Sequence, residues 1–166
     1  MNKTSVVVTG LAWMGAGVGS IESALERLFT SAKEEISLTV YALGTDPDRI
    51  TTWLEGALSR GVSVRMILNR SGEQPAAAIG SLRRLAASYP HFSLFRFSGP
   101  ESSELHAKVI VADRRLALVG SSNLSWHGMV ANHELALLVE GENAAAVASA
   151  LDRLFHSGFC ERLQGA

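Results

Sequence analysis

Short apolar runs alternate with helical patterns along this chain, and this alternation limits the available folds more than any other feature. Strands are predicted at 5–9, 36–43, 62–68, 92–97, 105–112, 116–120 and 132–139. Helices are predicted after Ser20 and at 46–59, 75–88 and 142–163, with Gly158 as a candidate break in the last. Helices separate the strands of the first half, and strands cluster in the second. The pattern predicts an α/β fold: a mixed β-sheet with helices on both faces.

Several residues mark where the predicted elements begin and end. Ser20 is a candidate N-cap for the first helix. Asp46 is a candidate cap for the second helix, with Pro47 at its first position and Gly61 as its stop. The short segment 113–115 joins two predicted strands closely enough to predict a hairpin. The loop from Gly10 to Gly19 lacks the ending of a P-loop and the spacing of a dinucleotide fingerprint.

Length and composition predict one soluble globular domain over residues 1–166. The chain is 47% hydrophobic and 19% charged, which is unlike a disordered protein. Its formal net charge of -1 excludes a whole-molecule field that attracts polyanions, but leaves a local basic groove open. No window has the charge-free apolar length of a membrane span, and no clear cleavage site precedes Gly19, so neither an anchor nor a signal peptide is expected. We predict a cytoplasmic protein with no stable membrane association.

The single cysteine, Cys160, argues against a disulfide framework. It has no cysteine partner within the chain, either for a disulfide or for a metal site. We interpret it as a small buried residue of the last helix. The sequence shows no cluster of acidic, histidine or cysteine residues with ligand spacing, and we expect neither a metal nor another cofactor.

His106 and Lys108 lie two residues apart at the start of a predicted strand, so their side chains share a face. Four apolar residues follow, at 109–112, and place this polar pair at one end of a buried strand. Buried titratable groups are costly unless they are paired or open to a cleft. The alternative is an edge strand with a solvated histidine and lysine, and the tripeptide taken alone favours it.

Two later segments also carry a pair of polar residues that lie two positions apart. Ser121 and Asn123 follow the next predicted strand, where turn chemistry is the ordinary explanation for both. Asn132 and Glu134 begin the strand after that, where a capped or exposed strand start is the alternative. Each pair is weak evidence by itself, and the order and spacing of all three pairs carry the argument.

Together these segments resemble the signature of the phospholipase D superfamily. The matching pattern is His106-x-Lys108-x4-Asp113, then Gly120-Ser121-x-Asn123, then Asn132-x-Glu134. Every element of the motif is present in the expected strand context, and the α/β pattern agrees across most of the chain. The resemblance implies a phospholipase D-like α-β-α sandwich and a metal-independent phosphodiesterase. It is specific for the superfamily and only weakly specific for the substrate.

The resemblance also implies catalytic roles. His106 would be the nucleophile that attacks phosphorus and forms a covalent phosphohistidine. Lys108 and Asn123 would hold the non-bridging oxygens and stabilise the charge that develops on them. Glu134 would accept a hydrogen bond from the other imidazole nitrogen and so fix its orientation.

The remaining motif residues rank lower. Ser121 would add a hydrogen bond at the site. Asp113 belongs to the family pattern, but its place in a strand connection suggests a structural role.

The leaving alkoxide needs a proton, and one histidine cannot be both nucleophile and acid in the same step. The chain has a single His-x-Lys, so the acid is either another histidine or His106 of a second copy across a two-fold axis. The other histidines are His91, His127, His133 and His156. His127 could line the cleft entrance, whereas His133 alternates away from its neighbours. Relatives with one motif form homodimers, and we favour a homodimer.

A small single-motif chain most resembles the bacterial endonuclease branch, which implies cleavage of DNA or RNA. Candidate contacts to the nucleic-acid backbone are Arg70, Arg83, Arg84, Arg114 and Arg115, although most of these are expected to be solvated. One alternative is a phospholipase D-type lipid phosphodiesterase, whose lipid contacts could include Trp13 and Met14. That loop could equally cover a nucleotide or pack at the dimer interface. Another alternative is a nucleic-acid-binding assembly module in a larger defence or repair complex.

Overall fold

A nine-stranded sheet runs through the computed structural model, which describes residues 2–13, 15, 17–45 and 48–163. The predicted cap Asp46, Pro47 and the loop residue Met14 lie outside the described residues. The strands are β1 (Lys3–Thr9), β2 (Gly19–Ser20), β3 (Glu35–Val40), β4 (Ser63–Leu68), β5 (Phe92–Phe97), β6 (Lys108–Ala112), β7 (Leu116–Gly120), β8 (Glu134–Glu140) and β9 (Cys160–Arg162). Their order in the sheet is β2-β1-β8-β7-β6-β3-β4-β5-β9.

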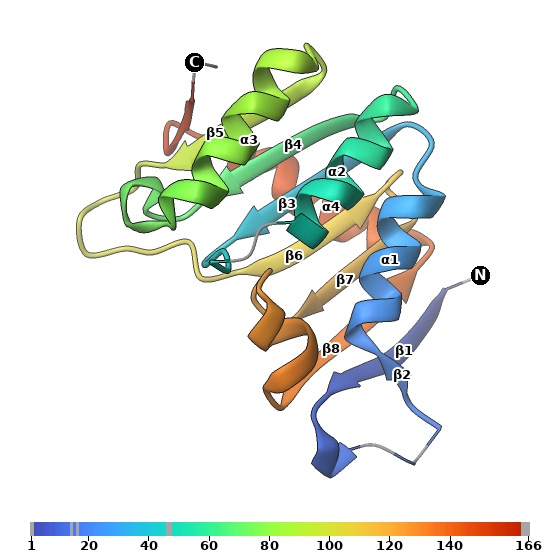
Figure 1. Cartoon of the computed structure of the whole chain (residues 1–166). Helices are drawn as coiled ribbons and strands as arrows, with labels where there is room; N and C mark the ends of the chain where they lie inside the picture. The colour runs from blue at the N-terminus through green and yellow to red at the C-terminus, as the bar shows by residue number, and fades with distance from the viewer. Residues whose placement is uncertain (1, 14, 16, 46–47, 164–166) are drawn as a thin grey trace.

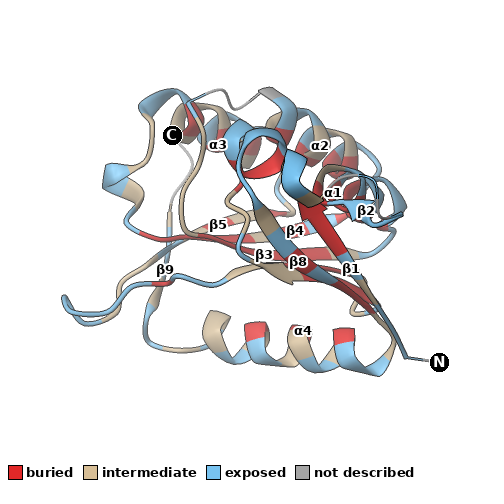
Figure 2. Cartoon of the chain, turned by 90° about the horizontal axis from the view of Figure 1, so that it is seen from below, coloured by how far each residue is buried: buried red, intermediate tan, exposed pale blue. Residues whose placement is uncertain are grey.

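Helices cover both faces of this sheet (Figure 1). The main helices are α1 (Ile21–Ser31), α2 (Asp48–Ser59), α3 (Ala76–Ser88) and α4 (Glu142–Phe155). The first three lie on one face and α4 lies on the other (Figure 2). Three short helical segments are η1 (Leu11–Trp13), η2 (Ser71–Glu73) and the π-helical turn η3 (His127–Ala131).

The sheet is mixed. Strands β3, β4 and β5 pair in parallel, whereas β6, β7 and β8 pair antiparallel with their neighbours. Parallel pairs need crossover connections, which α2 and α3 supply, and the antiparallel pair β6–β7 needs only a tight hairpin. The predicted fold class is therefore confirmed, and so is the predicted hairpin.

Apolar periodicity explains how the helices attach. On α1, Ile21, Leu25 and Leu28 recur at helical spacing and are almost completely buried against the sheet. Ser20 caps this helix as predicted, because its hydroxyl accepts a hydrogen bond from the Ser23 amide at 3.0 Å. On the other face, Ala144, Ala148 and Leu151 of α4 pack against Val111, Ala117 and Val139.

The end of the chain differs from the prediction. The last helix ends at Phe155, and the chain then turns and pairs Cys160 to Arg162 with β5. Cys160 is therefore a half-buried residue of an edge strand and not a buried residue of the helix. Apolar residues at 159 and 163 continue the helical spacing past the true end, which explains the error.

The starts of the two strands that carry motif residues also differ from the prediction. Strand β6 begins at Lys108, so the segment 105–107 is extended chain that precedes the strand. Strand β8 begins at Glu134 and not at Asn132. His106 and Asn132 therefore lie in loops next to the sheet, where their backbones are not held by the strand ladder.

Candidate active site

The predicted catalytic segments meet at one edge of the sheet. Strands β3 and β7 end at this edge, and the antiparallel strands β6 and β8 begin there (Figure 1). The residues that follow a strand end or precede a strand start are therefore neighbours in space. An open groove of about 450 Å³ lies at this edge, and its lining includes His106, Lys108, Ser121 and Asn123.

His106 presents an exposed imidazole to this groove. Its ring lies against the ring of Tyr41, with 4.2 Å between centroids and a 60° tilt. Its Nδ1 lies 3.4 Å from the ammonium of Lys108. The Nε2 atom has no hydrogen-bond partner among the described residues, so it is open to a ligand in the groove.

Lys108 is half-buried beneath the histidine. Its Nζ donates a hydrogen bond to the backbone oxygen of His106 at 2.9 Å and lies 4.5 Å from the centroid of the Tyr41 ring. Burial lowers the pKa of Lys108, and the charge of Glu134 opposes that shift. The ammonium is thus held close to the histidine in partly desolvated surroundings, where it interacts strongly with an anion.

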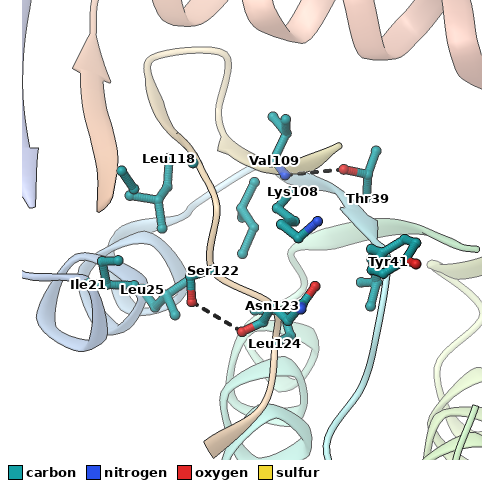
Figure 3. A pocket seen from close by; sticks show the side chains of 14 residues that line it. Ile21, Leu25, Thr39, Tyr41, Lys108, Val109, Leu118, Ser122, Asn123 and Leu124 are labelled. Atoms are coloured by element: carbon teal, nitrogen blue, oxygen red, sulfur yellow. Dashed lines mark hydrogen bonds between the residues drawn. The ribbon is translucent and has the colours of Figure 1, made fainter. Parts of the chain in front are cut away.

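Asn123 approaches Lys108 from the segment after β7. Both side chains line a small cavity of about 20 Å³ beside Tyr41 (Figure 3). The side-chain oxygen of Asn123 is buried and has no hydrogen-bond partner among the described residues. Because unsatisfied buried polar atoms are costly and rare, this acceptor oxygen is a candidate for contact with a hydrogen-bond donor such as water, which leaves the NH2 group of the same amide as the candidate donor to an anionic ligand.

Glycines allow this close arrangement. A Cβ atom on Gly120 would lie 2.3 Å from the Cβ of Ala136 on β8, so β7 and β8 could not approach this closely with any other residue there. A Cβ atom on Gly128 would lie 2.3 Å from the backbone oxygen of Asn123. Gly120 therefore lets β7 and β8 lie close together beside the groove, and Gly128 lets η3 lie against the segment that carries Asn123.

The carboxylate of Glu134 is held by two neighbouring side chains, those of Ser121 and Asn132. Its carboxylate accepts hydrogen bonds from the Ser121 hydroxyl and, at 3.3 Å, from the Asn132 amide. No hydrogen bond joins Glu134 to His106 within the described part of the chain, so the predicted contact between these two side chains is not formed in this single chain.

Asp113 lies at the opposite end of β6 from this groove. Its carboxylate accepts backbone N–H groups of Lys33, Glu34 and Glu35 at 2.8–3.0 Å. Asp113 and Arg114 both have positive φ angles, of 50° and 56°, and are the central residues of a turn that the Arg115 amide closes by donating to the Ala112 oxygen at 3.0 Å. Asp113 therefore joins the β6–β7 turn to the segment that enters β3.

The other histidines are placed apart from the lining of the groove. Nε2 of His133 accepts the Ala12 amide at 3.2 Å, and a ring nitrogen of His91 lies 2.9 Å from the Leu58 oxygen. His156 contacts its own helix through the Asp152 oxygen, at 2.7 Å.

The arginines predicted as backbone contacts differ in their surroundings. Near the site, Arg70 forms ion pairs with Glu73 and Glu104. At the far end of the sheet, Arg114 pairs with Asp152 and helps to attach α4.

Three residues that sequence reasoning missed also support the site. Tyr41 contacts both His106 and Lys108, and Thr39 and Asn69 hydrogen-bond to the backbone around His106. All three lie at or just beyond the ends of β3 and β4, which reach the same sheet edge. Position at the end of a parallel strand was the available signal.

The described residues contain no group of three or more His, Cys, Asp or Glu residues placed to hold a metal ion. Among the same residues, no helix has both the length and the apolarity that crossing a membrane requires.

Comparisons with known proteins agree with this geometry. The family model "Cardiolipin synthase, PLD-like domain" matches residues 25–157. The DISARM protein DrmC of Bacillus paralicheniformis is 33% identical over 142 residues, which are 84% of this chain and 58% of DrmC. Across the first curated relatives, the chain spans between 27% and 58% of their length.

Solved structures share the fold. Nuc from Salmonella typhimurium, a phospholipase D family member, aligns with a TM-score of 0.76 at 22% identity, covering 99% of both chains. NucT from Helicobacter pylori aligns with a TM-score of 0.79 at 20% identity, covering 98% of this chain and all of NucT. With the family model matching most of the chain, the motif's prediction is confirmed: this chain belongs to the phospholipase D superfamily, whose members include phosphodiesterase enzymes.

Proposed function

We propose that this chain is a metal-independent phosphodiesterase that cleaves nucleic acid through a covalent phosphohistidine at His106. The observation that carries the proposal is the convergence of the exposed His106 imidazole, the Lys108 ammonium and the Asn123 amide on one open groove. A phosphodiester is an anion that repels nucleophiles, so its cleavage needs a cation and hydrogen-bond donors around the phosphorus. The groove supplies a nucleophile in His106, a cation in Lys108 and a hydrogen-bond donor in the Asn123 amide.

In the first step, the free Nε2 of His106 attacks phosphorus, the new P–N bond forms, and the P–O bond to the leaving group breaks. Lys108 and the Asn123 amide hold the non-bridging oxygens, on which negative charge develops. The leaving alkoxide takes a proton from a second acid. Water then attacks phosphorus, gives its proton to the same group, and the P–N bond breaks to release the product and restore His106.

Glu134 supports this chemistry as an anion near the cationic groups. Its carboxylate is oriented by Ser121 and Asn132, and its charge acts on Lys108. In the assembled site, where the contact with His106 is predicted to form, we expect this carboxylate to stabilise the imidazolium of the reaction.

The second acid is proposed to be His106 of another copy of the chain. An apolar row crosses four strands on the α4 face of the sheet, because Val109, Val119, Leu137 and Val6 pair in register across β6, β7, β8 and β1. Val6, Leu135 and Leu137 are 40–47% exposed, which is unusual for aliphatic residues within a sheet. Val109 and Val119 also line the groove, so a second copy that covers this row brings its own histidine toward the first.

Nucleic acid is the substrate class that we favour. The groove is open to solvent, as access for a polymer backbone requires. The likenesses to Nuc and NucT, and to DISARM protein DrmC, are consistent with a nucleic-acid substrate or with a place in a defence complex.

One observation favours lipid as the second candidate substrate. Leu11 is 84% exposed on η1 and Trp126 is 53% exposed just before η3, and these two segments flank the end of β1. Exposed aliphatic and aromatic side chains on loops near a catalytic edge are typical of contact with a membrane surface.

The test compares labelled single-stranded and duplex DNA, RNA and phosphatidylcholine vesicles in EDTA, with His106→Ala as control. We expect metal-independent cleavage of nucleic acid that the variant lacks. Hydrolysis of the lipid alone would contradict the proposed substrate, and cleavage retained by His106→Ala would contradict the mechanism.

Sedimentation tests the second copy. The wild-type chain is expected to sediment as a dimer, and Leu137→Glu as an inactive monomer, since the charge lies in the middle of the apolar row. Phe159→Glu is the matched control, because Phe159 is equally exposed but precedes the edge strand β9. A fully active wild-type monomer would require another group as the acid.

A further inference from the structure

His106 lies where the strand ladder no longer holds the backbone. The ladder between β3 and β6 ends at the pair Thr39–Val109, and the segment 105–107 continues beyond it without strand pairing. A loop of this kind is ordinarily the mobile part of a structure. The imidazole nevertheless has a defined position against the Tyr41 ring, so other groups must hold its backbone.

The side chain of Thr39 holds the C-terminal side of His106. Its hydroxyl donates a hydrogen bond to the Ala107 oxygen at 2.8 Å and accepts one from the Val109 amide at 3.1 Å. Thr39 is 2% exposed, so water does not compete for these bonds. One buried hydroxyl thus replaces main-chain pairing at the point where β6 begins.

The side chain of Asn69 holds the N-terminal side. Its Oδ1 accepts the Leu105 amide at 2.9 Å, and Asn69 is also 2% exposed. Asn69 is itself fixed through its backbone. Its backbone N–H donates to the Val40 backbone oxygen, and its backbone oxygen accepts a hydrogen bond from the Gln74 side chain at 2.7 Å. The same Gln74 side chain donates to the backbone oxygen of Tyr41 at 2.9 Å.

We propose that Thr39 and Asn69 are positioning residues for His106: they clamp the peptide groups of Leu105 and Ala107 on its two sides and set the imidazole against Tyr41 at the groove. Both are among the few polar residues that the structure buries within its described part, and both direct their side chains to this one segment. The kinetic part of the inference rests on the proposed function, but the position of the imidazole does not.

The expected consequences follow from geometry. A nucleophile must stand within a few ångströms of phosphorus in the right direction, and a misplacement of about 1 Å can lower the rate about 100-fold. Removing the Asn69 clamp frees the N-terminal side of His106, and removing the Thr39 clamp frees its C-terminal side together with the two peptide groups that flank Lys108. We therefore expect both removals to lower kcat, with little change in KM for the Asn69 variant, which leaves the bonds around Lys108 and Asn123 intact.

The central variant pair is Thr39→Val and Thr39→Ser. Valine keeps the shape and burial of threonine but lacks the hydroxyl, whereas serine keeps the hydroxyl. We expect Thr39→Val to lose about 10- to 100-fold in kcat, and Thr39→Ser to restore most of it. Asn69→Leu removes the other clamp and is expected to act in the same direction. Thr39→Ala replaces Thr39→Val if the valine variant does not fold.

A second measurement does not depend on activity. Because the Tyr41 ring lies 4.2 Å away, we expect it to shift the ring-proton NMR signals of His106, which can be assigned by comparison with His106→Ala. In Thr39→Val and Asn69→Leu these signals are expected to move toward the positions of a solvated histidine, and in Thr39→Ser to stay. This result is obtained even if the protein proves not to cleave nucleic acid.

Ser37→Ala is the matched control. Ser37 is a buried hydroxyl two residues before Thr39 on the same strand, and it accepts hydrogen bonds from Arg65, which is not among the residues that line the groove. We expect it to lower the Tm while kcat and the His106 signals stay unchanged. The proposal is overturned if the folded clamp variants keep the wild-type His106 signals, or if Ser37→Ala moves those signals as much as Thr39→Val does.

Discussion

The two ends of β6 carry two parts of one motif, and their surroundings are opposite. At the Asp113 end, the carboxylate accepts three backbone N–H groups that join the hairpin to the segment before β3. At the other end, His106 is exposed, and the buried oxygen of nearby Asn123 has no partner within the described residues. Satisfied polar groups stabilise a fold, whereas unsatisfied ones at a groove are available to a ligand.

Residues at fixed spacing within one motif therefore need not share a role. Asp113 lies five positions after Lys108, which is a span of about 17 Å at the usual rise of an extended strand. A single substrate phosphate cannot contact both. We therefore assign chemistry to one end of β6 and stability to the other, and each of the following predictions tests that division.

The largest expected effect is the loss of activity in His106→Asn. Without the nucleophile, the covalent pathway is closed, and the cleavage rate is expected to fall by at least about 10⁴-fold. The Tm is expected to stay near that of the wild type, because the imidazole is exposed. Steady-state cleavage and a thermal melt check both. A large loss of Tm would show that this end of β6 also carries stability.

Lys108→Met is expected to have the next largest effect. It removes the cation from the groove but keeps most of the apolar stem, so kcat should fall by about 10²- to 10³-fold. Since burial disfavours the ammonium in the folded state, the free energy of unfolding is expected to stay constant or rise. Urea denaturation measures this, and clear destabilisation would contradict the division.

Asp113→Asn is expected to show the reverse profile. The amide cannot accept all three backbone N–H groups, and the free energy of unfolding should fall by about 1.5–3 kcal/mol. Well below the Tm, kcat is expected to stay within about two-fold of the wild type, because the groove lies at the other end of β6. A variant that is stable but inactive would place Asp113 in the chemistry.

The smallest effect is expected in the acid dependence of stability. Burial raises the pKa of Asp113, but hydrogen bonds from Glu35, Glu34 and Lys33, with nearby Arg115, bring it below its usual value. Its stabilising contribution is therefore complete above the pKa of the unfolded state, about 4, and is lost as the pH falls through the lower folded-state pKa. Between pH 5 and pH 2, the free energy of unfolding should fall less steeply with falling pH in Asp113→Asn than in the wild type. Equal slopes in the two proteins would contradict this.

Local pattern was enough to predict most of the sheet. The strands Phe92–Phe97 and Leu116–Gly120 were predicted to the residue, because loop or turn residues bound both. The end of α4 was missed, since apolar spacing continued beyond it and the pairing of β9 with β5 depends on residues 65 positions apart. The start of β6 was placed three residues early, because a strand pattern does not show where the partner strand stops.

The motif residues of the site were predicted from the sequence, and their supports were not. The resemblance to the family motif pointed to His106 and Lys108, and the sheet topology does bring Asn123 and Glu134 to the same edge. Tyr41 lies 65 positions before His106, so their contact follows only from the order of the strands. The predicted contact between Glu134 and His106 stays a prediction about the assembled site.

The central claim is that His106 becomes covalently attached to phosphorus. The direct measurement is to quench the reaction of the protein with a labelled oligonucleotide in EDTA at alkaline pH, where phosphohistidine is retained, and to map the adduct by mass spectrometry. We predict a phosphoryl-oligonucleotide adduct on His106 that forms and decays during turnover and is absent from His106→Asn. Turnover with no adduct, or an adduct on another histidine such as His127, would contradict the account.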